Sequence, residues 1–323
     1  MTLASPLVEV IKLRKNFSVS SGGWVRKAPG VVQAVADVSF EIRRGETLAL
    51  VGESGCGKST LARLLIRLID ATAGVVRFDG VDLNGLDASA LRRSRTNFQL
   101  IFQDAASSFN PRMRVENIVA EPLRIMGVKG AERRERAAAM LKLVGISDHQ
   151  MGRFSHEFSG GQRQRIGIAR ALVFKPKFVV CDDPVSALDV SIQAQVINLL
   201  SDLQKDLGLT YLFVSHDLRV VRHIANRVAV MYLGEIVEIG PVESLYSEPK
   251  HPYTQALLAS VPRRRSGTEP PRVPIGGEMP SARNPPSGCR FHTRCPMAQP
   301  ICQKEHPSLR PVDEDRSVAC HFA

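Results

Sequence analysis

The fold is decided by the stretch Gly52-Glu-Ser-Gly-Cys-Gly-Lys58-Ser59-Thr60, which fits the pattern G-x-x-x-x-G-K-S/T. It follows the apolar run Thr47–Val51 and precedes a helical pattern, the context that a phosphate-binding loop requires. Glycines let backbone N–H groups point inward at a helix N-terminus, where they form a nest for an anion. We therefore predict a triphosphate site in which Lys58 reaches the β- and γ-phosphates and Ser59 offers its hydroxyl to Mg²⁺. The predicted nucleotide contacts are Gly52, Glu53, Ser54, Gly55, Cys56, Gly57, Lys58, Ser59 and Thr60.

A second apolar strand pattern ends in two carboxylates, in the stretch Phe178-Val-Val-Cys-Asp182-Asp183. In phosphate-loop enzymes an Asp at such a strand end holds Mg²⁺, which is the role we predict for Asp182. Asp183 would then polarise the attacking water as the general base. Two acidic residues can also simply end a strand in a turn. The phosphate loop in the same chain favours the catalytic interpretation.

Strand and helix patterns alternate along much of the 323-residue chain, which indicates an α/β protein with parallel strand pairing. Val- and Ile-rich runs at residues 7–51 predict strands, and VVRFDGVDLNG predicts a hairpin with Asp79-Gly80 in its turn. Residues 104–157 predict a helical insertion, with ERRERAAAMLKLVGI as its clearest amphipathic run. From about Pro249 the composition shifts toward Pro and Arg, which indicates a C-terminal appendix.

The composition excludes some classes of protein. The apolar runs are far shorter than the roughly 20 residues of a membrane span, and the basic residues of the N-terminus follow its apolar ones, unlike a signal peptide. The net charge of +11 suits an anionic partner, or only good solubility. With 6% aromatic residues, a base-stacking groove is not expected. We expect a cytoplasmic protein whose membrane role is peripheral.

Further motifs between residues 45 and 217 narrow the class of NTPase. They are Phe158-Ser159-Gly160-Gly161-Gln162 before Asp182, Ser186-Ala187-Leu188-Asp189 after it, Gln103 behind Gln99-Leu-Ile-Phe, and His216 at the end of TYLFVS. They resemble, respectively, the signature, the D-loop, the Q-loop glutamine and the switch histidine of ATP-binding-cassette (ABC) proteins. A lone histidine at a strand end is most often structural. The resemblance therefore depends on the whole set of motifs.

The resemblance implies a fold and a mechanism. The fold would be a phosphate-loop NTPase (RecA-like) core with an antiparallel β-subdomain and an α-helical subdomain at about 104–160, within a cassette domain at 1–250. Two cassettes would face each other head to tail around two ATP molecules. Gln103 would sense Mg²⁺ and the attacking water, and His216 would hold the γ-phosphate. The residues expected to act on nucleotide at the paired cassettes are Ser159, Gly160, Gly161, Gln162 and Asp189.

In this family an aromatic residue near the first strand stacks on adenine. Phe17 in LRKNFSV is the first candidate and Trp24 is the second. An aromatic residue at this place can equally cap the core.

Asp183 departs from the pattern of the family, which usually has Glu at this position. Asp is one methylene shorter, and a misplacement on the order of 1 Å can cost about 100-fold in rate. We therefore hypothesise that this site hydrolyses ATP slowly and that a non-identical partner cassette supplies most of the turnover. The alternative is that the backbone shifts and Asp works adequately.

Four of the six cysteines gather near the C-terminus, with the spacing C-x5-C-x6-C-x17-C. They are Cys289, Cys295, Cys302 and Cys320. Clustered thiols in a cytosolic chain favour a metal over disulfides, and the loose spacing suits an iron–sulfur cluster better than a zinc ribbon. Cys56 and Cys181 are interpreted as packing residues.

The tail resembles that of cassette subunits from oligopeptide and dipeptide importers, of the second-ATPase type. The resemblance rests on His251-Pro-Tyr-Thr-Gln-Ala-Leu-Leu and Gly288-Cys-Arg-Phe-His-Thr-Arg-Cys-Pro, and it implies a C-terminal extension at 251–323. In that group the four cysteines bind a 4Fe–4S cluster, so we expect one here, with zinc or free thiols as alternatives.

The resemblance also implies the cofactors and the partners. ATP and Mg²⁺ would be bound by the cassette. The partners would be a second, non-identical ATPase subunit, two transmembrane permease subunits and an external solute-binding protein, at the cytoplasmic face of the bacterial inner membrane. Oligopeptides or dipeptides are the expected cargo, with nickel or another small solute as the alternative. A soluble ABC ATPase acting on nucleic acid or ribosomes, or a regulatory subunit, is the rival class; no nucleic acid partner is expected.

Overall fold

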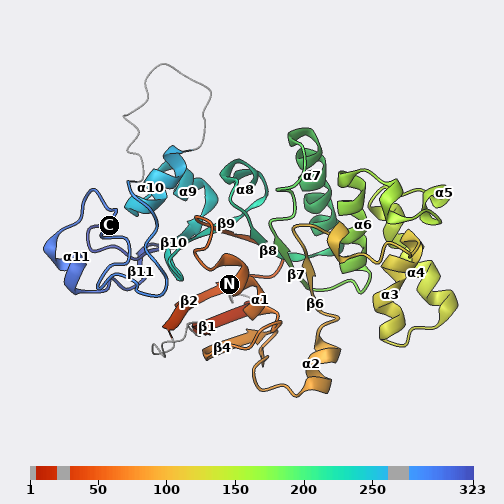
Figure 1. Cartoon of the computed structure of the whole chain (residues 1–323), viewed down its shortest axis with the longest axis horizontal. Coiled ribbons are helices and arrows are strands. Elements are labelled where there is room, and N and C mark those ends of the chain that lie inside the picture. The colour runs from red at the N-terminus through yellow and green to blue at the C-terminus, as the bar shows by residue number, and fades with distance from the viewer. Residues whose placement is uncertain (1–4, 20–29, 261–275) are drawn as a thin grey trace, which may run out of the picture. The chain divides into compact units, whose positions relative to one another are not determined.

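The computed structural model describes residues 5–19, 30–260 and 276–323. The chain divides into two compact units. The first contains residues 1–43, 47–85 and 214–323, and the second contains residues 44–46 and 86–213. Figure 1 colours and labels their helices and strands in chain order.

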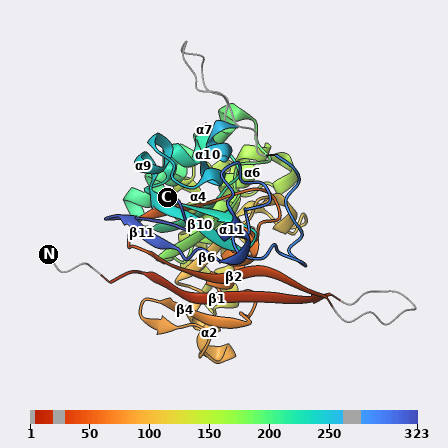
Figure 2. The ribbon, with the colours of Figure 1, turned by 90° about the vertical axis from the view of Figure 1, so that its left-hand side faces the viewer.

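An antiparallel four-stranded sheet forms the N-terminal part of the first unit (Figure 2). Its strand order is β2 (Gly30–Ile42), β1 (Val8–Val19), β4 (Ala73–Phe78) and β5 (Val81–Asp82). The chain passes from β4 to β5 through Asp79 and Gly80, whose φ angles are 52° and 79°. Two successive positive φ angles are typical of a tight hairpin turn, so the predicted hairpin is confirmed.

A second group of strands in the first unit leads into the phosphate loop. Within this unit the order is β11 (Arg310–Asp313), β12 (Arg316–Val318), β10 (Glu235–Pro241), β9 (Arg227–Tyr232) and β3 (Thr47–Val51). Strands β3 and β9 are parallel, whereas β9, β10, β12 and β11 pair antiparallel. All of β3 is buried, as expected for a central strand. The helices of this unit are α1 (Lys58–Leu65), α8 (Leu218–Ile224), α9 (Val242–Ser247), α10 (Pro252–Ala259) and α11 (Pro300–Lys304).

The second unit combines parallel strands with a group of helices. Its strands are β6 (Phe98–Ile101), β7 (Phe178–Asp182) and β8 (Thr210–Val214), and β6 pairs with β7 in parallel, as predicted. Its helices are α2 (Ala88–Ser94), α3 (Val115–Ile125), α4 (Gly130–Leu143), α5 (Asp148–Met151), α6 (Gly160–Leu172) and α7 (Val190–Leu207). Figure 1 shows α3, α4, α5 and α6 gathered in one group. None of the helices in the described part of the chain is long and apolar enough to cross a bilayer.

The predicted helical insertion contains α3, α4 and α5. Helix α3 buries Val115, Ile118, Val119 and Leu123, a spacing that places them on one face. Helix α4 buries fewer large apolar side chains, because its first half consists mainly of charged residues and its middle of alanines. The most strongly amphipathic helix is therefore α3, and not α4 as predicted.

A buried ion pair fixes the C-terminal strands to β10. Arg316 of β12 donates to Glu238 of β10 at 2.6 Å, and their side chains are 3% and 0% exposed. The carboxylate of Glu238 also accepts the backbone N–H groups of Lys250 at 3.0 Å and His251 at 2.9 Å. At the start of α10, Nδ1 of His251 accepts the N–H of Tyr253 at 3.0 Å. Burial lowers the pKa of His251 to about 3, so this acceptor nitrogen stays unprotonated at neutral pH.

Candidate functional site

The loop between β3 and α1 has the backbone of an anion nest. Gly52, Gly55 and Gly57 have φ angles of 149°, 81° and 110°, which side chains rarely tolerate. A Cβ atom at Gly52 would lie 2.2 Å from the carbonyl oxygen of Met231, and one at Gly57 would lie 2.2 Å from that of Ala34. The neighbouring backbone therefore approaches so closely that only glycine fits. Since Gly57 is the N-cap of α1, the helix N-terminus begins at the loop.

The side chain of Lys58 folds back over this loop. Its Nζ atom donates to the carbonyl oxygens of Gly52 and Glu53, both at 2.8 Å. An ammonium group held beside inward-facing glycine backbone supplies positive charge for a polyphosphate. Ser59 and Thr60 follow in the first turn of α1, and Ser54 and Gly55 lie in the loop. This donor set fits a triphosphate with Mg²⁺.

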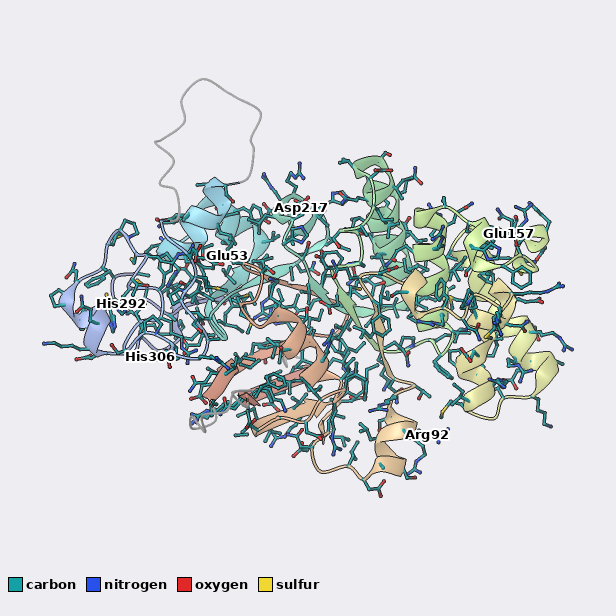
Figure 3. The ribbon with its side chains drawn as sticks, viewed as in Figure 1. Glu53, Arg92, Glu157, Asp217, His292 and His306 are labelled. Atoms are coloured by element: carbon teal, nitrogen blue, oxygen red, sulfur yellow. The ribbon has the colours of Figure 1, made fainter. Side chains whose placement is uncertain are left out.

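Sequence reasoning missed two residues of the first unit that contact the loop. The hydroxyl of Tyr253 accepts the backbone N–H of Glu53 at 2.9 Å. The guanidinium of Arg294 lies 3.1 and 3.2 Å from the two carboxylate oxygens of Glu53, which Figure 3 labels. The two residues lie 200 and 241 positions from Glu53 in the chain, so no local sequence pattern predicts the contact.

His216 follows β8 and belongs with the first unit. It is exposed, and its neighbours Ser215 and Asp217 are held in place. The N–H of Ser215 donates to the carbonyl of Leu50 in β3 at 3.2 Å. Asp217, labelled in Figure 3, caps α8 by accepting the N–H of Arg219 at 2.9 Å. Through Ser215, the predicted switch histidine is thus tied to the strand that enters the phosphate loop.

The predicted catalytic residues of the second unit form a hydrogen-bonded group. Asp182 is the half-buried last residue of β7. Asp183 follows with a φ of 50°, a left-handed conformation that Asp tolerates better than most residues. Its carbonyl accepts from the hydroxyl of Ser186 at 3.1 Å, and that hydroxyl accepts from Nε2 of Gln103 at 3.0 Å. Ser186, which the sequence placed only within the D-loop match, connects the predicted base to the predicted Q-loop glutamine.

The stretch that resembles the family signature caps α6. The hydroxyl of Ser159 accepts the N–H of Gln162 at 3.4 Å, and Oε1 of Gln162 accepts the N–H of Ser159 at 3.1 Å. This reciprocal arrangement is a capping box. Ser159 and Gly160 are exposed, whereas a Cβ atom at Gly161 would meet Ile192 of α7 at 2.4 Å. The capping box and the close approach of α7 at Gly161 therefore fix this helix N-terminus, while Ser159 and Gly160 remain exposed.

Asp189 is the exposed N-cap of α7, and its carbonyl accepts the N–H of Gln193 at 2.8 Å. Phe17 lies on β1 of the first unit with 39% of its surface exposed. Nζ of Lys15 lies 5.0 Å from the centre of its ring, so one face of the ring already has a cation above it. Trp24, the other candidate for adenine stacking, lies outside the described residues.

The four C-terminal cysteines line one cavity of about 390 Å³, together with His292 and His321. No group of three or more His, Cys, Asp or Glu side chains in the described part of the chain is placed to hold a metal ion. The prediction of an iron–sulfur cluster at Cys289, Cys295, Cys302 and Cys320 is therefore wrong. The spacing of cysteines along the chain does not fix the spacing of their sulfur atoms in space.

Comparisons with known proteins show the family to which the chain belongs. The family model described as "ABC transporter" matches residues 35–186, and the one described as "Oligopeptide/dipeptide transporter, C-terminal region" matches residues 237–302. The oligopeptide transport ATP-binding protein AppF of Bacillus subtilis is 51% identical over 98% of this chain and 97% of its own length. The oligopeptide transport ATP-binding protein OppF of Escherichia coli is 50% identical over 94% of this chain and 92% of its own.

Among solved structures, a dimeric ATP-binding cassette in a post-hydrolysis state with ADP and Pi is similar, with a TM-score of 0.63 and 29% identity. The similarity covers 73% of this chain and 98% of that one, and it confirms the predicted phosphate-loop cassette fold.

Proposed function

The chain belongs to the ATP-binding proteins of oligopeptide ABC transporters, and from this premise we propose how its residues use ATP to drive peptide import. As a member of that family it is an ATPase coupled to transport. The alternatives of a nucleic-acid or ribosome ATPase and of a nickel importer are not favoured by relatives of this kind. The observation that carries the proposal is the glycine-lined loop with Lys58 folded over it.

ATP binding would begin at this loop. The N–H groups of the loop and of the first turn of α1 would surround the phosphates, and Lys58 would exchange its two carbonyl partners for phosphate oxygens. Ser59, Gln103 and Asp182 are the oxygen donors proposed for Mg²⁺, which supplies charge neutralisation at the phosphates when bound. Phe17 is proposed to stack on adenine, since its exposed ring lies on the first strand.

Hydrolysis would depend on Asp183, Gln103 and His216. Asp183 would accept the proton of the attacking water, while Gln103 orients that water. The hydroxyl of Ser186 accepts a hydrogen bond from Gln103 and so positions it, but Ser186 takes no part in proton transfer. His216 would contact the γ-phosphate. Because the Asp183 carboxylate is one methylene shorter than that of Glu, we propose that hydrolysis at this site is slow.

The exposed N-terminus of α6 suits a second cassette. Ser159 presents a hydroxyl and Gly160 a backbone N–H, which are donors for a γ-phosphate bound on the partner. Gln162 fixes the cap, and Asp189 lies exposed at the start of α7. Membership of the family implies dimerisation and permease partners, and a solved relative is a dimer. We propose a non-identical second ATPase, two transmembrane permeases and an external binding protein.

We further propose a peripheral location at the cytoplasmic face of the inner membrane, and a division into a cassette at residues 1–250 and an extension at 251–323. The extension contains most of the stretch that matches the oligopeptide transporter model. It distinguishes this chain from a cassette alone, and it carries the assignment to peptides.

The test is to purify the complex through a tag on this chain and identify its other subunits. After reconstitution with the binding protein, we expect uptake of a labelled oligopeptide that requires ATP inside the vesicle. Recovery of the chain without membrane subunits, together with ATPase activity stimulated by RNA or ribosomes, would reject the importer in favour of the rival class.

A further inference from the structure

Two residues of the C-terminal region, residues 237–302, contact Glu53 of the phosphate loop. Tyr253 holds the backbone N–H of Glu53, and Arg294 holds its carboxylate. The side chain of Arg294 is 7% exposed and that of Glu53 is 28% exposed, so water screens this ion pair only weakly. Its strength should therefore exceed that of an ordinary surface pair.

Both contacting side chains are themselves fixed. The ring of Tyr253 packs against those of Tyr232 and Phe291, with centroid distances of 4.7 and 5.4 Å. The guanidinium of Arg294 lies 5.8 Å from the centre of the Tyr232 ring, and its Nε donates to the carbonyl of Gly276 at 3.0 Å. A side chain locked in this way can hold its partner in one geometry.

The charge of Glu53 matters for an anionic ligand. Glu53 is the acidic residue of the stretch Gly52–Thr60, and its carbonyl is one of the two that accept from Lys58. The charge of Glu53 acts on Cys56 in the same loop. Burial raises the pKa of the Cys56 thiol, Lys58 opposes this rise, and the carboxylate of Glu53 adds to it. Without Arg294, this carboxylate would repel a triphosphate in the same loop.

We propose that Arg294 and Tyr253 are positioning residues for ATP: through Glu53 they hold the phosphate loop and neutralise its acidic side chain. The C-terminal region thereby sets the nucleotide affinity of the cassette. This inference rests on the proposed function, since it assumes that the triphosphate binds in the loop.

The experiment measures binding of the fluorescent N-methylanthraniloyl derivative of ATP, with Mg²⁺, to the purified full chain. The variants are Arg294→Gln, Arg294→Lys, Tyr253→Phe, Glu53→Gln and the double variant Arg294→Gln with Glu53→Gln. The control is Arg310→Gln, because Arg310 belongs to the same extension, residues 251–323, and its guanidinium donates to the carbonyls of Cys320 and Ala323. Thermal unfolding checks that each variant is folded.

At low salt we expect Arg294→Gln to weaken binding about tenfold, with Arg294→Lys between it and the parent. Tyr253→Phe should weaken it about fivefold, since the N–H of Glu53 loses its acceptor. The deficit of Arg294→Gln should shrink in 0.5 M salt, to about threefold. The double variant should bind better than Arg294→Gln alone, because the unpaired negative charge is gone. A purely structural role predicts that the double variant binds no better than Arg294→Gln.

Parent affinity in a folded Arg294→Gln, or a double variant as weak as Arg294→Gln, would overturn the proposal. If Arg294→Gln does not fold, the same comparison is made with Arg294→Lys, for which no loss, or a loss that Glu53→Gln does not relieve, overturns it equally. Failure of the parent and of Arg310→Gln to bind the probe would instead reject the proposed function itself.

Discussion

The phosphate loop of the first unit and the acidic strand end of the second are held by different forces. In the loop, Gly52 and Gly57 lie so close to neighbouring carbonyl groups that a Cβ atom would be 2.2 Å away. At the end of β7, Asp183 keeps a left-handed backbone while the hydroxyl of Ser186 connects it to Gln103. Steric exclusion sets the first geometry, and hydrogen bonds set the second.

The difference determines how each region responds to change. A backbone that has no room for a side chain tolerates no substitution without moving. A hydrogen-bonded group loses about 1 kcal/mol when one bond is removed, and so fails by degrees. We therefore expect all-or-none effects at the loop glycines Gly52 and Gly57, and graded effects at the strand end.

The largest effect is expected for Gly57→Ala. The new Cβ would collide with the carbonyl of Ala34 at a φ of 110°, so the loop must move by about 1 Å, and ATP affinity should fall about 100-fold. The matched control is Gly80→Ala, whose φ is 79° but which has open space around it. It should cost about 1 kcal/mol of stability and leave affinity within about twofold. Calorimetric titration with ATP separates the two; equal affinities would refute steric control of the loop.

Asp183→Glu tests the graded region. Glu extends the carboxylate by one methylene toward the water, so ATPase activity of the assembled transporter should rise about tenfold. The left-handed backbone at Asp183 favours Asp, so a small loss of stability should accompany the gain. Steady-state phosphate release measures the rate. Unchanged or lower turnover counts against a short carboxylate as the limit.

Ser186→Ala should act in the other direction. Without the hydroxyl, Gln103 loses its partner at 3.0 Å and kcat should fall about fivefold, while the ATP affinity stays as it was. Ser191→Ala, on the exposed first turn of α7, serves as the control. A fall in affinity rather than in kcat would mean that Ser186 supports nucleotide binding instead.

The smallest effect is expected for the pH dependence of stability that comes from His251, whose ring accepts the N–H of Tyr253. The pKa of His251 is about 3 in the folded chain and near its ordinary 6.5 when unfolded. Because the unfolded chain binds the proton that the folded chain excludes, stability should fall as the pH drops below about 6.5, by at most about 1.4 kcal/mol per pH unit. His251→Asn keeps an acceptor at the start of α10 without the titration and should flatten this dependence. Chemical denaturation at pH 7 and pH 5.5 measures it; identical slopes for parent and variant exclude His251 as the cause.

The two regions also show what sequence can predict. The loop, the strand β7 and the hairpin at Asp79-Gly80 have local signals, namely glycine spacing, apolar runs and turn residues, and the structure contains each of them. The contact between Arg294 and Glu53 had no such signal, because it joins residues 241 positions apart. Ser186 was visible as part of a motif, but its link to Gln103 depends on how the chain folds.

For the cysteines, the error was to predict a site rather than to miss one. Their clustering in sequence was interpreted as a metal site, yet the side chains in the described residues form no group that could hold one. Sequence spacing predicts a site where the intervening backbone is regular, as in the phosphate loop. In an irregular Pro-rich stretch it does not, because the positions of the sulfur atoms depend on tertiary packing.

The central claim is that a triphosphate is bound at the nest capped by Lys58. Calorimetric titration of the full chain and of its Lys58→Ala variant with MgATP tests it most directly. We expect micromolar binding by the parent and a loss of at least about 100-fold in the variant. Without nucleotide the variant should lose only about 1–2 kcal/mol of stability, from the two hydrogen bonds of Lys58 to the carbonyls of Gly52 and Glu53. Equal affinity in the two proteins would contradict it.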